Sequence, residues 1–94
     1  MIAVIARLTA KEGQGAALEK VLSALGEQVR VSEPGCKLYQ LCKSPTPDEV
    51  VVLERYQDKH ALDTHGNTPH FRAAFQELSQ LLGKAPAIEV LTEL

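Results

Sequence analysis

The sequence predicts an α+β domain of ferredoxin-like βαββαβ topology, in which an antiparallel four-stranded sheet carries two helices on one face. Two observations support this fold class. Apolar segments of strand character and amphipathic helical segments follow one another in the order strand, helix, strand, strand, helix, strand. The chain has 94 residues, and no linker, repeat or low-complexity tract divides it. We therefore expect residues 1–94 to form a single domain.

The first half of the chain holds a strand, a helix and a second strand. Residues 2–8 form an apolar run that is typical of a strand. From residue 16 to Val29 apolar side chains recur at helical spacing, and Pro34 with Gly35 ends the helix. The segment 36–42 is the second predicted strand.

The second half repeats this order with a broken helix. A proline-rich turn precedes a third strand, which begins at residue 48 or 49 and ends at Tyr56. Asp58 is the expected N-cap of the first helical part, and Thr68, followed by a proline, is the N-cap of the second. Gly83 ends this helix, and residues 87–94 form the last strand. The apolar stripe of the second part consists of Phe71, Phe75, Leu78 and Leu82.

Both faces of the third strand carry apolar side chains. Val50 and Val52 point to one face of the sheet, and Val51 and Leu53 point to the other. Two helices cover only one face, so the second face would expose a large apolar patch in a monomer. We therefore expect a homodimer formed through this sheet face.

The charge balance and the cysteines exclude several function classes. Ten Lys and Arg residues stand against twelve Asp and Glu residues, without a basic run, which disfavours nucleic acid and anionic membranes as partners. No signal-peptide pattern or membrane-length apolar run occurs, so a cytoplasmic protein is expected. Cys36 and Cys42 would lie about 20 Å apart on one strand, too far for a disulfide, and are expected to be reduced.

The segment from Glu54 to Phe71 concentrates the side chains that are capable of chemistry. It contains all three histidines, at positions 60, 65 and 70. This spacing turns successive rings about 140° apart on a helix, which disfavours a metal site. His60 is expected to be exposed and His70 to be structural. His65 fits either a structural hydrogen bond at the helix break or a general base, because imidazole exchanges protons near neutral pH.

The third strand places further polar groups near this segment. Glu54 and Tyr56 share one face, while Arg55 points to the other. For Glu54 we expect a salt bridge or a bond to backbone N–H groups, including at the dimer interface, ahead of a role in a site. Tyr56 suits either an interface or a cavity wall. Phe71 and Phe75 are predicted core residues that would also wall a cavity for a flat ring.

These residues resemble the antibiotic-biosynthesis-monooxygenase-like proteins, which belong to the dimeric α+β barrel superfamily. The resemblance spans essentially the whole chain and is carried by Glu33-Pro34-Gly35, Glu54 with Tyr56, Ala61 with Leu62, His65, and Thr68-Pro69-His70-Phe71. It implies a cavity between the sheet and the helices of each subunit, with His65 at its mouth or wall. Members include cofactor-free quinol oxygenases, haem-degrading oxygenases and an isomerase of a phosphorylated sugar derivative.

The resemblance implies a cofactor-independent monooxygenase that acts on a small quinol or enol, with His65 as the catalytic base and neither a metal nor a cofactor. Haem-degrading relatives carry His, Asn and Trp where the nearest positions here hold Phe75, Ala6 and His65, so haem is not expected. An isomerase of a small phosphorylated carbonyl compound and a non-catalytic ligand-binding dimer are the alternatives. The predicted substrate-binding residues are Leu62, Phe71 and Phe75, which would exclude water, and Tyr39, Tyr56 and Arg7, which would orient an oxyanion.

Overall fold

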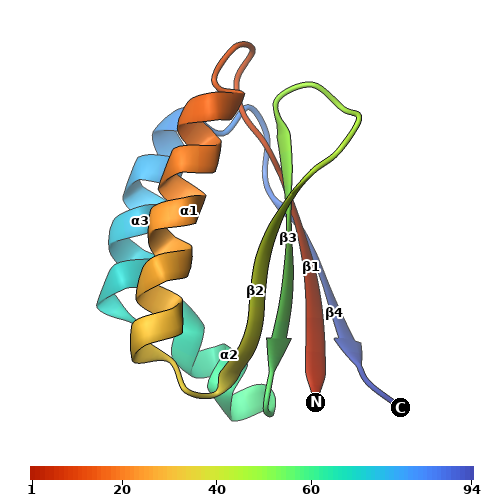
Figure 1. Ribbon diagram of the computed structural model, residues 1–94. Helices are drawn as coiled ribbons and strands as arrows, with labels where there is room; N and C mark the ends of the chain where they lie inside the picture. The colour runs from red at the N-terminus through yellow and green to blue at the C-terminus, as the bar shows by residue number, and fades with distance from the viewer.

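The computed structural model describes residues 1–94 and confirms the predicted fold class. Its elements are β1 (Ile2–Thr9), α1 (Gly15–Ser32), β2 (Cys36–Lys43), β3 (Glu49–Tyr56), α2 (Lys59–Gly66), α3 (Pro69–Leu81) and β4 (Ala87–Thr92). The strands form one antiparallel sheet in the order β2-β3-β1-β4. All three helices lie on the same side of this sheet, with α1 and α3 side by side (Figure 1).

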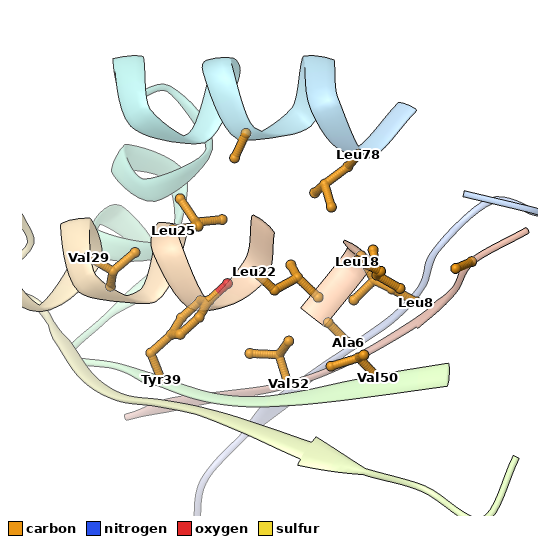
Figure 2. Packing of buried hydrophobic residues seen from close by; sticks show 12 residues of the cluster. Ala6, Leu8, Leu18, Leu22, Leu25, Val29, Tyr39, Val50, Val52 and Leu78 are labelled. Atoms are coloured by element: carbon orange, nitrogen blue, oxygen red, sulfur yellow. The ribbon is translucent and has the colours of Figure 1, made fainter. Parts of the chain in front are cut away.

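The core lies between the sheet and the two long helices. Leu22 and Leu25 of α1 and Leu78 of α3 are buried, and they face Ala6 and Val52 of the central strands (Figure 2). The apolar positions of α1 recur every three or four residues, so the helix turns one continuous stripe toward the sheet. Removing such side chains from water supplies most of the driving force for folding.

The break between α2 and α3 is fixed by the two predicted caps. The Asp58 side chain accepts a hydrogen bond from the Ala61 N–H at 2.8 Å, and the Thr68 hydroxyl oxygen accepts one from the Phe71 N–H at 3.2 Å. The Thr68 hydroxyl also donates to the carbonyl of His65 at 2.9 Å. The chain is therefore held on both sides of the break, and the position of His65 is held with it.

A second set of side-chain bonds fixes the start of α1. Asp48 adopts a positive φ of 60°, and its two carboxylate oxygens accept hydrogen bonds from the N–H groups of Gly13 and Gly15, each at 3.0 Å. A Cβ atom on Gly15 would lie 2.8 Å from the Asp48 Oδ1 atom. Asp48 thus belongs to the turn, and the third strand begins at Glu49.

The sheet face opposite the helices has no cover within the chain. Leu38 of β2, Leu53 of β3 and Leu91 of β4 are exposed there, around the partly buried Ile5. An ion pair between Arg55 and Glu93, at 2.7 Å, lies at one end of this face. Both cysteines are free, in agreement with the prediction, and both are half-buried. None of the helices is both long and apolar enough to cross a bilayer.

Candidate functional site

A cavity of about 220 Å³ lies between the sheet and the helices. Twelve of its sixteen lining residues are hydrophobic. Its apolar walls come from the central strands, from α1, and from Leu62, Phe71 and Phe75 of α2 and α3. Only three side chains bring polar atoms to it, those of Tyr39, Glu54 and His65. A largely apolar cavity with a few convergent polar groups is the usual form of a small-molecule site.

His65 is held in one orientation by a carboxylate behind it. Its Nδ1 atom lies 2.9 and 3.0 Å from the two carboxylate oxygens of Glu33. The exposed fractions of these residues are 6% for His65 and 7% for Glu33. Because an ionised carboxylate only accepts hydrogen bonds, Nδ1 carries the proton, and the lone pair of a neutral ring lies on Nε2.

Glu33 is shared by a second histidine. The Nε2 atom of His70, in the first turn of α3, lies 2.5 Å from the Glu33 Oε2 atom. The structural role predicted for His70 is therefore a contact with the Glu33 carboxylate. The His65 Nδ1 and His70 Nε2 atoms both face the Glu33 carboxylate, not a shared position between the two rings where an ion could sit. No group of three His, Cys, Asp or Glu residues could hold a metal ion.

Glu33 was not predicted as a site residue, although one local signal points to it. It is the C-cap of α1, where the helix dipole disfavours a negative charge. A buried acidic side chain at this position needs compensating donors from elsewhere in the fold. The donors come from 32 and 37 residues further along the chain, a pairing that local sequence patterns do not reveal.

Glu54 faces the cavity, and this corrects the expectation of a salt bridge or an interface position. Its parity with Val52 and Tyr56 turns it toward the helices, and the Tyr56 hydroxyl donates a hydrogen bond of 2.5 Å to its Oε1 atom. Burial raises the pKa of the Glu54 carboxyl above its ordinary value, whereas the Tyr56 hydrogen bond and the nearby His65 ring oppose this shift.

Tyr39 reaches the cavity from β2. Its ring centroid lies 6.2 Å from that of His65, and burial beside the Glu54 carboxylate raises the pKa of its hydroxyl, which stays protonated at neutral pH. The ring packs against Gly26 in the middle of α1, where an added Cβ would lie 3.1 Å from the Tyr39 Cδ1 atom. The missing side chain of Gly26 thus makes room for the tyrosine ring.

One polar atom on each of these three side chains has no hydrogen-bond partner in the protein. These atoms are the His65 Nε2, the Glu54 Oε2 and the Tyr39 hydroxyl. No buried side-chain nitrogen or oxygen lacks a partner, so these three atoms are accessible. All three belong to residues that line the cavity, so they are the unpartnered polar groups next to a bound molecule.

The structure brings most of the predicted site residues together. Tyr39, Leu62, His65, Phe71 and Phe75 line the cavity, although Phe75 is 46% exposed and so lies at its edge instead of in the core. Two predictions need correction. Tyr56 is fully buried behind Glu54 and does not line the cavity. Arg7 points to the opposite sheet face, where its nearest acidic partner is Glu49 at 3.8 Å.

The error for Arg7 has a simple physical cause. On β1 the helix-facing positions are Val4, Ala6 and Leu8, which are buried, so the residue between them must point away. Both parity classes of this strand contain apolar side chains. Alternation alone therefore does not tell which class lies beneath the helices.

Comparison with known proteins places this fold and cavity in a family. Residues 1–77 match the family model described as antibiotic biosynthesis monooxygenase. A proposed monooxygenase of Mycobacterium tuberculosis is 36% identical over 93 residues, which cover 99% of this chain and 91% of that protein. Its solved structure superposes with a TM-score of 0.90.

A second solved structure supports the same assignment. It is described as an antibiotic biosynthesis monooxygenase of Caulobacter crescentus, assigned without proof of activity, and has a TM-score of 0.93 and 38% identity. The match covers 99% of this chain and 89% of that one. These findings confirm the resemblance that the sequence shows: the chain belongs to the antibiotic biosynthesis monooxygenase family.

Proposed function

We propose that the protein is a cofactor-independent monooxygenase of small quinol or enol compounds, with His65 as the general base. One observation carries the proposal. The imidazole of His65 is held by the buried Glu33 at Nδ1, its Nε2 atom has no partner within the protein, and the residue lines an apolar cavity. This is the arrangement in which a histidine removes a proton from a bound hydroxyl group.

The proposed reaction begins with a proton transfer. The substrate hydroxyl gives its proton to His65 Nε2, and the negative charge of Glu33 stabilises the imidazolium that forms. The substrate anion is then electron-rich enough to react with O₂. One oxygen atom enters the ring and the other leaves as water, so that a quinol and O₂ give a hydroxyquinone and water. The substrate supplies all four electrons that reduce O₂ and both hydrogen atoms of the water, and no external reductant is needed.

The apolar walls support this chemistry in two ways. The rings of Phe71 and Phe75 stack with their centroids 6.0 Å apart, and the Phe71 ring meets the His65 ring edge-on at 5.0 Å. A flat aromatic substrate fits beside such rings. The same walls exclude water, which strengthens the interaction between the substrate anion and the imidazolium.

The cavity does not favour the alternative of a phosphorylated substrate. No Lys or Arg lines it, and its polar end holds the Glu54 carboxylate. A phosphate group would enter an apolar space beside a like charge without a cation to compensate it. An isomerase of a phosphorylated carbonyl compound is therefore the weaker proposal.

Oxygen uptake tests the proposed function. The purified protein is supplied with a panel of hydroquinones, and His65→Ala is compared with His60→Ala, which changes an exposed histidine of the same helix. We expect His65→Ala to lose at least a hundredfold in turnover and His60→Ala to keep it. Equal turnover in both variants would remove His65 from the mechanism. A wild-type protein that binds hydroquinones without consuming O₂ would be the non-catalytic ligand-binding dimer.

We also propose that two copies associate through the open sheet face. Leu38, Leu53 and Leu91 are each 37–42% exposed there, and an apolar patch of this kind is unusual on a monomer. Light scattering should give twice the mass of 10.2 kDa. Leu53→Glu should shift the protein toward the monomer, whereas a monomeric wild type at micromolar concentration would contradict the proposal.

A further inference from the structure

Glu54 is the second carboxylate of the site, and the mechanism proposed for His65 assigns no role to it. We propose that Glu54 is a substrate-binding residue that acts with His65 to select an uncharged ligand carrying two hydroxyl donors, and to reject anionic ligands. The inference rests on the proposed function, because it specifies which molecules that cavity accepts. It depends on where the hydrogen-bond donors and acceptors of the cavity lie.

Two of the three open polar atoms are acceptors. Glu33 receives the Nδ1 proton of His65, which leaves a lone pair on Nε2. The Tyr56 hydroxyl donates to the Oε1 atom of Glu54, and the Oε2 atom has no partner within the protein. The third open group, the Tyr39 hydroxyl, both donates and accepts. A ligand therefore satisfies the polar end fully only if it brings two O–H donors.

A ligand without these donors leaves a buried acceptor unpaired. Sites built to bind a hydroxyl group discriminate strongly against analogues that lack it, because the lost water contacts of the protein group are not replaced. The monomethyl ether of a quinol keeps one donor for His65 and has none for Glu54. A quinone has no O–H donor at all, and a hydroxyquinone, the product of oxygen insertion into a quinol, keeps only one, so either oxidised form leaves this site more readily than the quinol does.

Charge acts in the same direction. Glu54 is buried, Glu33 lies behind His65, and none of the lining residues is a Lys or an Arg. A carboxylated quinol would bring a further negative charge into an apolar space that already holds one. Glu54 therefore serves two purposes: it accepts the second hydroxyl and it excludes anions of the same shape.

The ligand comparison uses wild-type protein without oxygen, so that binding is measured apart from turnover. Calorimetry compares hydroquinone and catechol with their monomethyl ethers, and with 2,5-dihydroxybenzoate and 3,4-dihydroxybenzoate. We expect each uncharged diol to bind at least tenfold more tightly than its ether and than its carboxylated analogue. Equal Kd values within either comparison would overturn the inference, and so would an absence of binding by both diols.

The variant comparison assigns the effect to Glu54. Glu54→Gln keeps an oxygen that accepts from Tyr56 but removes the charge, and Glu49→Gln is the matched control on the same strand outside the cavity. The Gln variant should bind the carboxylated diols at least tenfold more tightly than wild type does, whereas the control should not change. If Glu54→Gln binds the carboxylated diols as weakly as wild type does, Glu54 does not have this role. If the variant does not fold, the wild-type ligand comparison decides.

The two proposals fail separately. Diol selectivity without oxygen uptake would remove the monooxygenase proposal and leave the role of Glu54 intact. Oxygen uptake that depends on His65, with no preference for diols over their ethers, would support the monooxygenase proposal and overturn the role of Glu54.

Discussion

The Glu33→Gln substitution removes the charge from the carboxylate that His65 and His70 share, while it keeps the size of the side chain. A carboxylate accepts hydrogen bonds from both imidazoles, at 2.9 and 2.5 Å. A carboxamide has only one oxygen, and its NH₂ group would face the N–H of the other ring. One of the two histidines must then turn, change its tautomer or lose its partner.

The size of the effect follows from these contacts. Loss of one buried hydrogen bond to a charged group costs about 1.5–3 kcal/mol, and the opposed donors that remain add roughly 1 kcal/mol. We expect the free energy of unfolding to fall by about 2.5–4 kcal/mol. Turnover should fall by about 10²–10⁴, because His65 would lose both its fixed tautomer and the charge that stabilises its protonated form.

Thermal denaturation and oxygen uptake measure the two effects on the same samples. Glu27→Gln is the matched control, because Glu27 lies on α1 as well and forms only an exposed pair with Arg30. Such a change is expected to alter stability by less than about 0.5 kcal/mol. A Glu33→Gln protein as stable and as active as the control would refute the view that Glu33 organises the site.

Three further outcomes are expected. Gly26→Ala should weaken diol binding several-fold in calorimetry, because its Cβ displaces the Tyr39 ring; a gain of about 1 kcal/mol in stability with unchanged binding would contradict this packing. Burial raises the folded-state pKa of Glu54 above that of the unfolded chain, so the native state loses stability as the pH rises between the two values; the stability of Glu54→Gln relative to wild type should therefore be greater at pH 7 than in acid. A denaturation series over pH checks this prediction, which a stability difference that does not change with pH would contradict. Arg7→Gln should keep kcat/KM within about twofold, since Arg7 lies outside the cavity, and a tenfold loss in kinetic assays would show otherwise.

Local patterns were sufficient to predict the fold. Helical spacing in α1, alternation in β3, and the caps at Asp58 and Thr68 each depend on residues that are close in the chain, and each is confirmed. The same patterns predicted an open apolar sheet face, because two helices cannot cover both sides of one sheet.

The site was only partly predictable. His65 follows from the resemblance, and Tyr39 was among the residues predicted to orient an oxyanion, whereas the pairing of Glu33 with His65 and His70 joins α1 to two other helices and is not revealed by local sequence patterns. The position of Arg7 was wrong for a related reason, since alternation fixes relative directions but not which face meets the helices. What the sequence lacks is therefore the contact between distant elements.

The division of the cavity between elements has a consequence for how such a protein can diverge. Tyr39 and Glu54 stand on β2 and β3, whereas His65 shares α2 with Leu62 and is braced by Glu33 from the end of α1; Phe71 and Phe75 come from α3. Phe75 stacks on Phe71 at the edge of the cavity, one ring removed from His65, so substitutions there can change the shape of the accepted molecule without moving the proton-transfer group. Within one family, a new substrate can therefore be acquired by altering the edge of the cavity while the chemistry is inherited at its polar end.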